Sequence, residues 1–168
     1  LVRSYDGLGR LLTIESYSNG QPYASETYAY DCLGNITSRT EPGGNVYTYE
    51  YDSRGRSTKV INPDGTFTQT EFDDTEARVT HIDENGHYKE YQYDWAGKLT
   101  AVKEFLDPPS FSLTLYEYNK TGSITRIINA NGEVIQMEYG SLFGPTLVTY
   151  PDGTTRSFTY DSVGNMLT

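Results

Sequence analysis

The sequence contains one cysteine, Cys32, two histidines and no long hydrophobic run. A lone cysteine excludes both a disulfide framework and a cysteine-based zinc site within the chain. No apolar run approaches the ~18 residues of a membrane span, and no signal peptide is visible, so we expect no membrane insertion by this segment. The chain starts at Leu1 and stops at Thr168 in the middle of a repeating unit, and we therefore expect it to be an excerpt of a longer protein.

Basic residues are also scarce. The 13 lysines and arginines face 23 aspartates and glutamates, which gives a formal charge of −10. Nucleic-acid binding needs basic patches that displace counterions from phosphates, and none is visible. Contact with an anionic membrane surface is disfavoured for the same reason. The acidic balance mainly indicates solubility.

Apolar residues make up only 36% of the chain, and the mean hydropathy is −0.61. Tyrosine and glycine, with 16 copies each, fill the deficit. Tyrosine favours pleated, half-buried surfaces and glycine favours turns, so the composition indicates β structure. The length of 168 residues suits one domain, residues 1–168, and we find no domain boundary and no helical segment of useful length.

An aromatic residue recurs at a nearly constant interval, and we call these residues the anchors. The interval is 21 residues, with 25 residues in two places. Repeats of this length indicate an array of supersecondary units. The eight anchors are Tyr5, Tyr30, Tyr51, Phe72, Tyr93, Tyr118, Tyr139 and Tyr160.

Each anchor opens a short motif such as "YDGLGRLL" or "YDWAGKLT". Aspartate at the first turn position and glycine at the fourth are the preferences of a type I turn. The carboxylate can accept a backbone N–H two residues on, and glycine tolerates the left-handed exit. Aspartate follows six anchors, at Asp6, Asp31, Asp52, Asp73, Asp94 and Asp161.

A second turn precedes five of the anchors by seven residues. It reads "EPGG", "NPDG", "DENG", "NANG" and "YPDG". This pattern predicts a type I turn with a glycine bulge, a common three-residue hairpin loop. The closing glycines are Gly44, Gly65, Gly86, Gly132 and Gly153.

Two turns per repeat leave two strands of six to seven residues, or about sixteen strands in the chain. Tyr49 and Tyr51 alternate with Thr48 and Glu50, which predicts that the tyrosines share one face. The strand after the anchor turn has apolar positions of conflicting parity, which predicts a bulge at an unspecified place. Two segments break the period, residues 15–24 and 104–112; both contain proline, and we interpret them as longer hairpin loops.

The motif "YDxxGRLT" on a 21-residue period, with "PDG" between copies, resembles the rearrangement-hotspot (RHS) or YD repeat. The copies "YDGLGRLL", "YDCLGNIT", "YDSRGRST", "YDWAGKLT" and "YDSVGNML" carry the resemblance, which extends from Tyr5 to Thr168. Proteins of this family include bacterial polymorphic toxins, the C component of insecticidal Tc toxins, and animal teneurins. The resemblance implies a ribbon of β-hairpins that spirals into a hollow shell, and in the toxins the shell holds a C-terminal toxic domain.

Two copies depart from the pattern. The fourth, "FDDTEARV", has Glu76 where glycine is expected, and the seventh, "YGSLFGPT", lacks the aspartate and has Pro145 where a strand should begin. The family's downstream core region, which cleaves itself in the toxins, has no matching motif here. We therefore transfer no protease activity to any residue.

Several residues suggest functions that a structural role explains better. The recurrent aspartates suggest paired carboxylates for glycoside hydrolysis, but a catalyst needs one pair and not a ladder. The tyrosine columns suggest a stacking platform for sugars, whereas a cross-strand ladder on the inner face of a sheet is the simpler interpretation. His81 and His87, with Asp83 and Glu84, lack a convincing metal-ligand set, and the Asp/Asn-rich turns lack the spacing of a known calcium loop.

Three further residues lie in the predicted turns. Cys32 lies in a turn, and we interpret it as a free side chain. Asn35 and Asn119 begin glycosylation sequons, which matter only in a secreted eukaryotic protein. The sequence thus predicts an all-β array of about eight hairpin repeats that forms a curled antiparallel ribbon. We expect no enzyme activity, no catalytic, cofactor-binding or metal residues, and no cofactor.

The predicted role is structural. We expect a repeat segment of a secreted or surface-exposed shell whose partners are the rest of its own shell and an encapsulated C-terminal toxin domain. The alternative is an extracellular binding or adhesion module that contacts glycans or a partner protein at the cell surface. The charge and composition predict no nucleic-acid partner.

Overall fold

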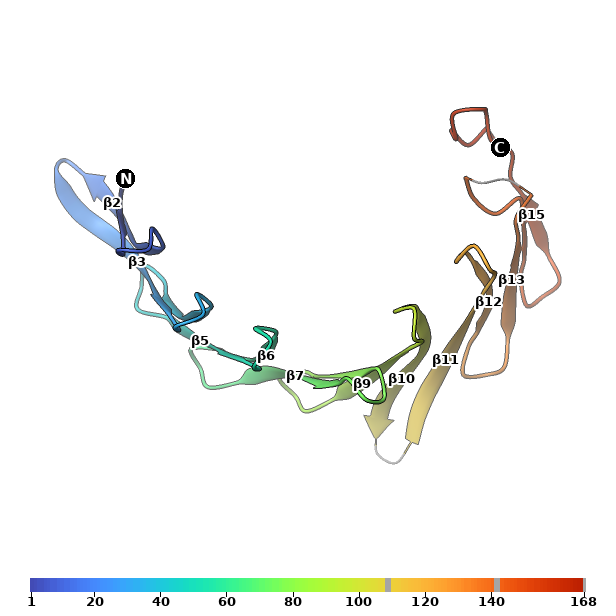
Figure 1. Cartoon of the computed structure of the whole chain (residues 1–168), viewed down its shortest axis with the longest axis horizontal. Helices are drawn as coiled ribbons and strands as arrows, with labels where there is room; N and C mark the ends of the chain where they lie inside the picture. The colour runs from blue at the N-terminus through green and yellow to red at the C-terminus, as the bar shows by residue number, and fades with distance from the viewer. Residues whose placement is uncertain (108–109, 141–142, 168) are drawn as a thin grey trace. The chain divides into compact units, whose positions relative to one another are not determined.

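The computed structural model describes residues 1–107, 110–140 and 143–167. These residues form fifteen β-strands and no helix, so none of their elements is a helix that could cross a membrane. The strands belong to one antiparallel sheet and are ordered in it as they are in the chain (Figure 1). The all-β hairpin array predicted from the sequence is confirmed.

The strands are β1 (Val2–Tyr5), β2 (Leu11–Ser18), β3 (Gln21–Tyr30), β4 (Ile36–Thr40), β5 (Val46–Tyr51), β6 (Ser57–Ile61), β7 (Phe67–Asp73), β8 (Arg78–Ile82), β9 (Tyr88–Tyr93), β10 (Leu99–Asp107), β11 (Ser110–Tyr118), β12 (Ile124–Ile128), β13 (Val134–Glu138), β14 (Leu147–Thr149) and β15 (Thr155–Ser157). The last predicted pair of strands is reduced to a single bridge between Tyr160 and Met166.

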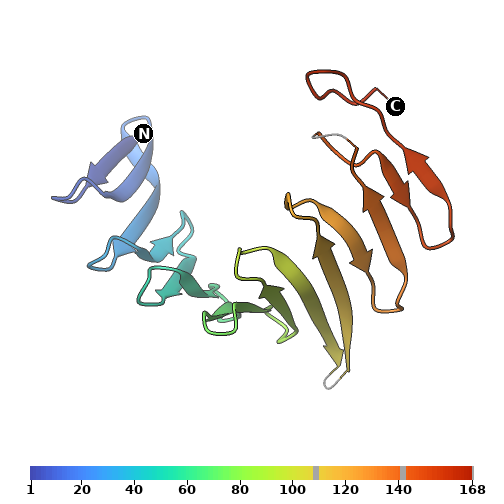
Figure 2. The ribbon, with the colours of Figure 1, turned by 45° about the vertical axis from the view of Figure 1, so that its right-hand side comes forward.

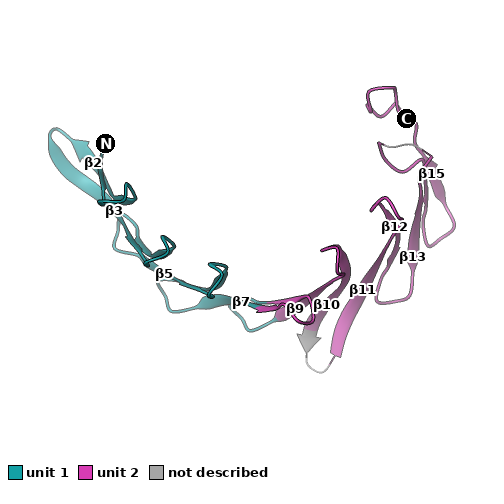
Figure 3. Cartoon of the chain, in the orientation of Figure 1, with its two compact units in different colours: residues 1–71, 81–87 teal, residues 72–80, 88–168 magenta. Residues whose placement is uncertain are grey.

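The chain divides into two compact units (Figure 3). Unit 1 comprises residues 1–71 and 81–87, and unit 2 comprises residues 72–80 and 88–168. Within unit 2, strands β9 to β15 lie side by side in one layer (Figure 2). Apart from the end strands β1 and β15, each strand pairs with the strand before it and the strand after it, so the sheet is built from local hairpins.

A β-bulge in the strand after each regular anchor turn resolves the conflicting parity of the apolar residues. Tyr51 pairs with Ser57 but Glu50 pairs with Lys59, so Thr58 is the extra residue. The first apolar position therefore lies beside the anchor, and the apolar residue three positions later returns to the same face. Equivalent register shifts make Leu12, Thr37, Thr58, Thr100 and Thr125 the bulge residues.

The two segments that interrupt the period lengthen strands and do not form long loops, which corrects the sequence interpretation. β2 continues to Ser18 and β3 starts at Gln21, so the loop is only Asn19 and Gly20, with φ of 50° and 76°. Asn-Gly with positive φ at both positions is the type I′ turn, which closes a hairpin in two residues. The second segment likewise extends β10 and β11, and residues 108–109 lie outside the described part.

The divergent repeats differ as the sequence suggests. In the fourth copy the left-handed conformation moves from the expected glycine position to Ala77, with φ of 49°. In the seventh copy β14 starts at Leu147, two residues after Pro145. Residues 141 and 142 of that turn lie outside the described residues.

The sheet is a single layer with almost no interior. Val148, at 7% exposure, is the only described residue that is buried. A compact protein of this mass exposes about 8,300 Å². This chain exposes 11174 Å², about a third more than that expectation. The fold therefore relies on contacts between neighbouring strands and leaves sheet surface available to other molecules.

Candidate functional site

The recurrent aspartates build the turns in which they lie. The Asp6 Oδ1 atom accepts the backbone N–H groups of Leu8 and Arg10, both at 2.9 Å. Its Oδ2 atom accepts the Arg10 Nε–H at 2.6 Å. Gly9 closes the turn by donating its N–H to the Asp6 carbonyl at 3.0 Å. The same backbone hydrogen bonds to the side-chain oxygen recur at Asp31, Asp52, Asp94, Asn119 and Asp161.

These hydrogen bonds stabilise the ionised carboxylates. The backbone N–H of Arg10 is the main cause that lowers the pKa of Asp6, and that of Arg56 does the same for Asp52. At Asp31 and Asp161 the main cause is the side-chain amide of the asparagine four residues on. A general acid requires a raised pKa, so this pattern fits turn formation and not acid catalysis.

The anchor tyrosines connect successive repeats. The Tyr30 hydroxyl donates a hydrogen bond to the Leu11 carbonyl at 2.8 Å, next to the bulge residue of the preceding repeat. Tyr51 donates to Ile36 in the same way, at 2.9 Å. In unit 2 the corresponding acceptors of Tyr118, Tyr139 and Tyr160 are the carbonyls of Leu99, Ile124 and Pro145.

A cation in the motif adds a second connection between repeats. The Arg10 guanidinium lies over the Tyr30 ring, 4.8 Å from its centroid, and donates a hydrogen bond to the Asp31 carbonyl at 3.0 Å. In unit 2 the Lys98 ammonium lies 5.4 Å from the centroid of the Tyr118 ring. The anchor rings of Tyr30 and Tyr118 are thus covered by a residue of the preceding repeat.

In each unit the pairing register separates two chemically different faces. We call the face that carries the anchors the tyrosine face. The strand carboxylates of the tyrosine face form ion pairs: Glu26 with Arg39, and Glu104 with Lys89. The Arg39 guanidinium hydrogen bond is the main cause that lowers the pKa of Glu26. Most strand carboxylates lie on the opposite face, at Glu15, Glu50, Glu71, Glu90, Glu117 and Glu138.

The tyrosine face contains a second row of tyrosines, two residues before the anchors. Tyr28 also occupies this row, but its hydroxyl hydrogen-bonds to Glu26. We call the other three, Tyr49, Tyr91 and Tyr116, the second-row tyrosines. They are half-buried, and each ring pairs across the sheet with an aliphatic side chain or lies beside one, as Tyr49 does with Val60. Unlike the hydroxyls of the anchors Tyr51 and Tyr118, their hydroxyls have no hydrogen-bond partner among the described residues.

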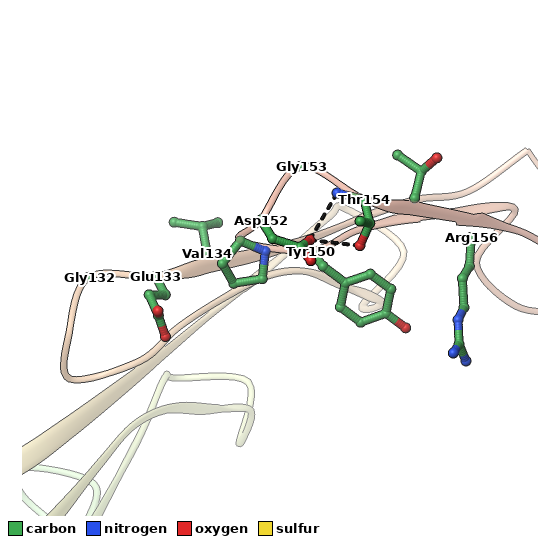
Figure 4. A pocket seen from close by; sticks show the side chains of 10 residues that line it. Gly132, Glu133, Val134, Tyr150, Asp152, Gly153, Thr154 and Arg156 are labelled. Atoms are coloured by element: carbon green, nitrogen blue, oxygen red, sulfur yellow. Dashed lines mark hydrogen bonds between the residues drawn. The ribbon is translucent and has the colours of Figure 1, made fainter.

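A cleft of about 1000 Å³ lies in unit 2 between the β12–β13 turn and the β14–β15 turn. The Tyr150 ring forms part of its wall, with the Arg156 guanidinium 5.9 Å from the ring centroid. Figure 4 shows Tyr150, Arg156 and Glu133 extending to the same side of the ribbon. Asp152 binds the Thr154 N–H and hydroxyl through one oxygen, and the Thr154 hydroxyl is the main cause that lowers its pKa.

Of the histidines and carboxylates singled out in the sequence, the structure brings His87 to Asp83 and places His81 beside a threonine. His81 Nδ1 lies 3.3 Å from the Thr70 hydroxyl, and His87 Nδ1 lies 3.2 Å from Asp83 Oδ2. The described residues contain no cluster of three or more metal-ligating side chains. Cys32 is exposed in its turn.

The two sequon asparagines both belong to turns but differ in their contacts. Asn35 donates its amide to Asp31 at 2.8 Å, whereas the Asn119 oxygen accepts the Thr121 hydroxyl at 2.7 Å. Sequence reasoning missed three features: the hydroxyl bonds of the anchors, the unpartnered second row, and the cleft at Tyr150. The constant two-residue spacing between second-row and anchor tyrosines was a usable sequence signal for the anchor hydroxyl bonds and for the second row.

Two overlapping stretches of the sequence, residues 5–45 and 30–66, match the RHS Repeat family. Residues 5–66 of the chain carry RHS repeats. The hydrogen-bonded Asp-to-Gly turn continues beyond the matched stretches, to Asp161 and Gly164, so the later repeats share the geometry of the matched ones. No curated protein matches the chain in sequence.

The fold resembles that of solved Tc toxin structures. The crystal structure of TcdB2-TccC3 superposes with a TM-score of 0.73 at 18% identity, over 98% of this chain and 11% of that chain. TcdB2-TccC3-Cdc42 gives 0.61 at 16% identity, over 98% and 12% of the two chains. TcdB2-TccC3 without its hypervariable C-terminal region gives 0.59 at 16% identity, over 95% and 12%. At these identities the likeness is one of fold, and the chain spans about a ninth of those proteins.

Proposed function

We propose that this RHS-repeat chain is a wall segment of a shell that encloses a toxin domain, within a secreted or surface-exposed protein. The observation that carries the proposal is the uncovered tyrosine face of a single-layer sheet. The fold likeness to TcdB2-TccC3 supports the same role. We refer to the enclosed polypeptide as the passenger.

The two faces suit opposite environments. The face with Glu15, Glu50 and Glu90 has the charged composition of solvent-exposed protein surface. The tyrosine face has fewer strand carboxylates and is rich in aromatic groups, which resembles the centre of a protein interface. A wall needs such a difference between its outer and inner surfaces.

We assign this chain no reaction. The aspartates that a hydrolase would use are occupied by their own turns, as Asp6 and Asp52 show. A structural wall requires only that each repeat bind its neighbours, and the hydroxyl bonds of Tyr30 and Tyr118 supply that connection.

Limited proteolysis of the complete protein tests the proposal. The passenger should be cleaved far more slowly inside the complete protein than when it is expressed alone. Mild urea that opens the repeats should make it cleavable at the rate of the free passenger. Equal cleavage of the passenger in both contexts, without urea, would refute enclosure.

The cleft at Tyr150 favours a second candidate, binding of a neutral saccharide by an extracellular module. An aromatic face stacks on a sugar ring, while the Arg156 guanidinium and the Glu133 carboxylate offer donors and acceptors to hydroxyl groups. The chain's charge of −10 disfavours a sulfated or acidic sugar.

Titration with maltotriose and with chitotriose, followed by NMR, tests this candidate. Binding should perturb the signals of Tyr150 and Arg156 and should be abolished by Tyr150→Ala. Thr149→Ala, on the opposite face of β14, is the matched control and should leave binding unchanged. Equal effects of the two substitutions, or no binding of either sugar, would exclude the cleft as a saccharide site.

A further inference from the structure

We propose that the second-row tyrosines Tyr49, Tyr91 and Tyr116 hold the passenger polypeptide through hydrogen bonds from their hydroxyls. The inference rests on the proposed enclosing function and assigns residues to it. The anchors and the second-row tyrosines lie on the same face but contact different partners. The anchors bind the repeats to one another, and the second row binds what covers the face.

On strands β5 and β11, the hydroxyl contacts distinguish the anchor from the second-row tyrosine. Tyr51 and Tyr118 each donate to a backbone carbonyl of the preceding repeat, at 2.9 Å and 2.6 Å. Tyr49 and Tyr116, two residues earlier, find no such acceptor among the described residues. A hydroxyl on a face that another molecule covers loses its water and requires a new partner, because an unsatisfied polar group is costly. A covering molecule must therefore supply acceptors at these positions.

The fold itself does not require these hydroxyls. The position two residues before the anchor is occupied by Met137 in the seventh repeat and by Phe158 in the eighth. Met137 occupies the equivalent place opposite Val148 within the sheet, without a hydroxyl. Sheet formation therefore does not require a tyrosine at the second-row position, and the hydroxyl is available for binding.

The chemistry of the face favours a polypeptide occupant over a saccharide. Tyrosine gives large, rigid contact area at low entropic cost, and peptide carbonyls are acceptors for its hydroxyl. Aliphatic partners such as Val60 and Ile127 lie across from the rings and suit apolar side chains of a passenger. The strand carboxylates that would bind sugar hydroxyls are engaged with Arg39 and Lys89.

The exposed area is sufficient for such an interface. The chain exposes 11174 Å², about 2,800 Å² more than a compact protein of its mass. A stable protein interface covers about 800 Å² on each partner. The excess surface is larger than one side of such an interface.

The test combines Tyr49→Phe, Tyr91→Phe and Tyr116→Phe in the complete protein and measures the rate at which the passenger becomes cleavable. Each hydroxyl is removed while its ring is kept. Three lost hydrogen bonds should speed exposure of the passenger roughly 10-fold or more. The matched control removes the hydroxyls of Tyr23 and Tyr88, which also have no described hydrogen-bond partner; Tyr88 lies on the opposite face.

Each outcome bears on a different claim. Wild-type protein that leaves the passenger cleavable would refute the enclosing function itself. Protection that is identical in the triple variant and the control would refute the role of the second row while leaving enclosure intact. Loss of self-association or of maltotriose binding in the triple variant, with passenger protection unchanged, would assign the face to those occupants and overturn the proposal.

Discussion

The anchor hydroxyl predicts a measurable connection between repeats, and Tyr51→Phe is the cleanest way to remove it. The substitution deletes one oxygen and keeps the ring that lies on the tyrosine face. The lost contact is the 2.9 Å hydrogen bond to the Ile36 carbonyl in the preceding repeat. Tyr49→Phe, two residues away on the same strand and face, deletes a hydroxyl that has no described partner and is the matched control.

The expected loss of unfolding free energy is about 1 kcal/mol for Tyr51→Phe and close to zero for Tyr49→Phe. Burial of Tyr51 is the main cause that raises its pKa, so its hydroxyl is partly shielded from water. Solvent therefore replaces the lost bond incompletely. With a urea dependence of about 2 kcal/mol per molar, the unfolding midpoint of Tyr51→Phe should fall by roughly 0.5 M.

The assay is equilibrium unfolding in urea of the two variants and the wild type, followed by circular dichroism. A midpoint for Tyr49→Phe that falls as far as that for Tyr51→Phe would refute the division between anchor and second-row tyrosines. An unchanged midpoint for both would refute the view that the anchor hydroxyl holds neighbouring repeats together.

Three further predictions concern the turns and the contacts between repeats. Gly44→Ala should lower the unfolding free energy by about 1–2 kcal/mol in a denaturation experiment, because its φ is +85°, while Gly43→Ala, in ordinary backbone beside it, should cost less. The hydroxyl of Thr66 is the main cause that lowers the pKa of Asp64, so the carboxylate stabilises the fold above about pH 4 and this stabilisation is lost as the pH falls further. The melting temperature of Asp64→Asn should therefore fall less than that of the wild type between pH 7 and pH 2. Arg10→Met should lower the melting temperature by a few degrees, since it removes the ion pair with Asp6, the hydrogen bond to the next repeat and the cation over the Tyr30 ring. An unchanged melting temperature would argue against a stabilising role of these contacts.

The turns were predictable because their chemistry is local. Aspartate or asparagine at the first position and glycine at the fourth are fixed by hydrogen bonds and backbone angles inside five residues, as Asp6 and Gly9 show. The bulge could be inferred from parity, but its place could not, because a bulge residue such as Thr58 has the same strand-forming character as its neighbours. Only the pairing register distinguishes it.

The errors arose where two local signals competed. In residues 15–24 the proline at position 22 suggested a loop, whereas the Asn19-Gly20 pair specified a two-residue turn and extended strands. The cleft gave no sequence signal at all. Tyr150 and Arg156 are unremarkable strand and turn residues, and the β14–β15 hairpin brings their side chains together.

The scarcity of buried residues and the open face have the same cause, which is that contacts between neighbouring repeats stabilise the sheet. An ordinary sheet buries one face under a second layer, and its stability depends on that layer. Here contacts between neighbouring repeats, such as the hydrogen bond from Tyr118 to Leu99 and the Lys98 cation over the Tyr118 ring, add to the hydrogen bonds within each turn. Stability that is supplied between neighbours does not require a covering layer. The tyrosine face therefore remains available for a partner, and the second-row hydroxyls are the groups on it that neither the turns nor the contacts between repeats use.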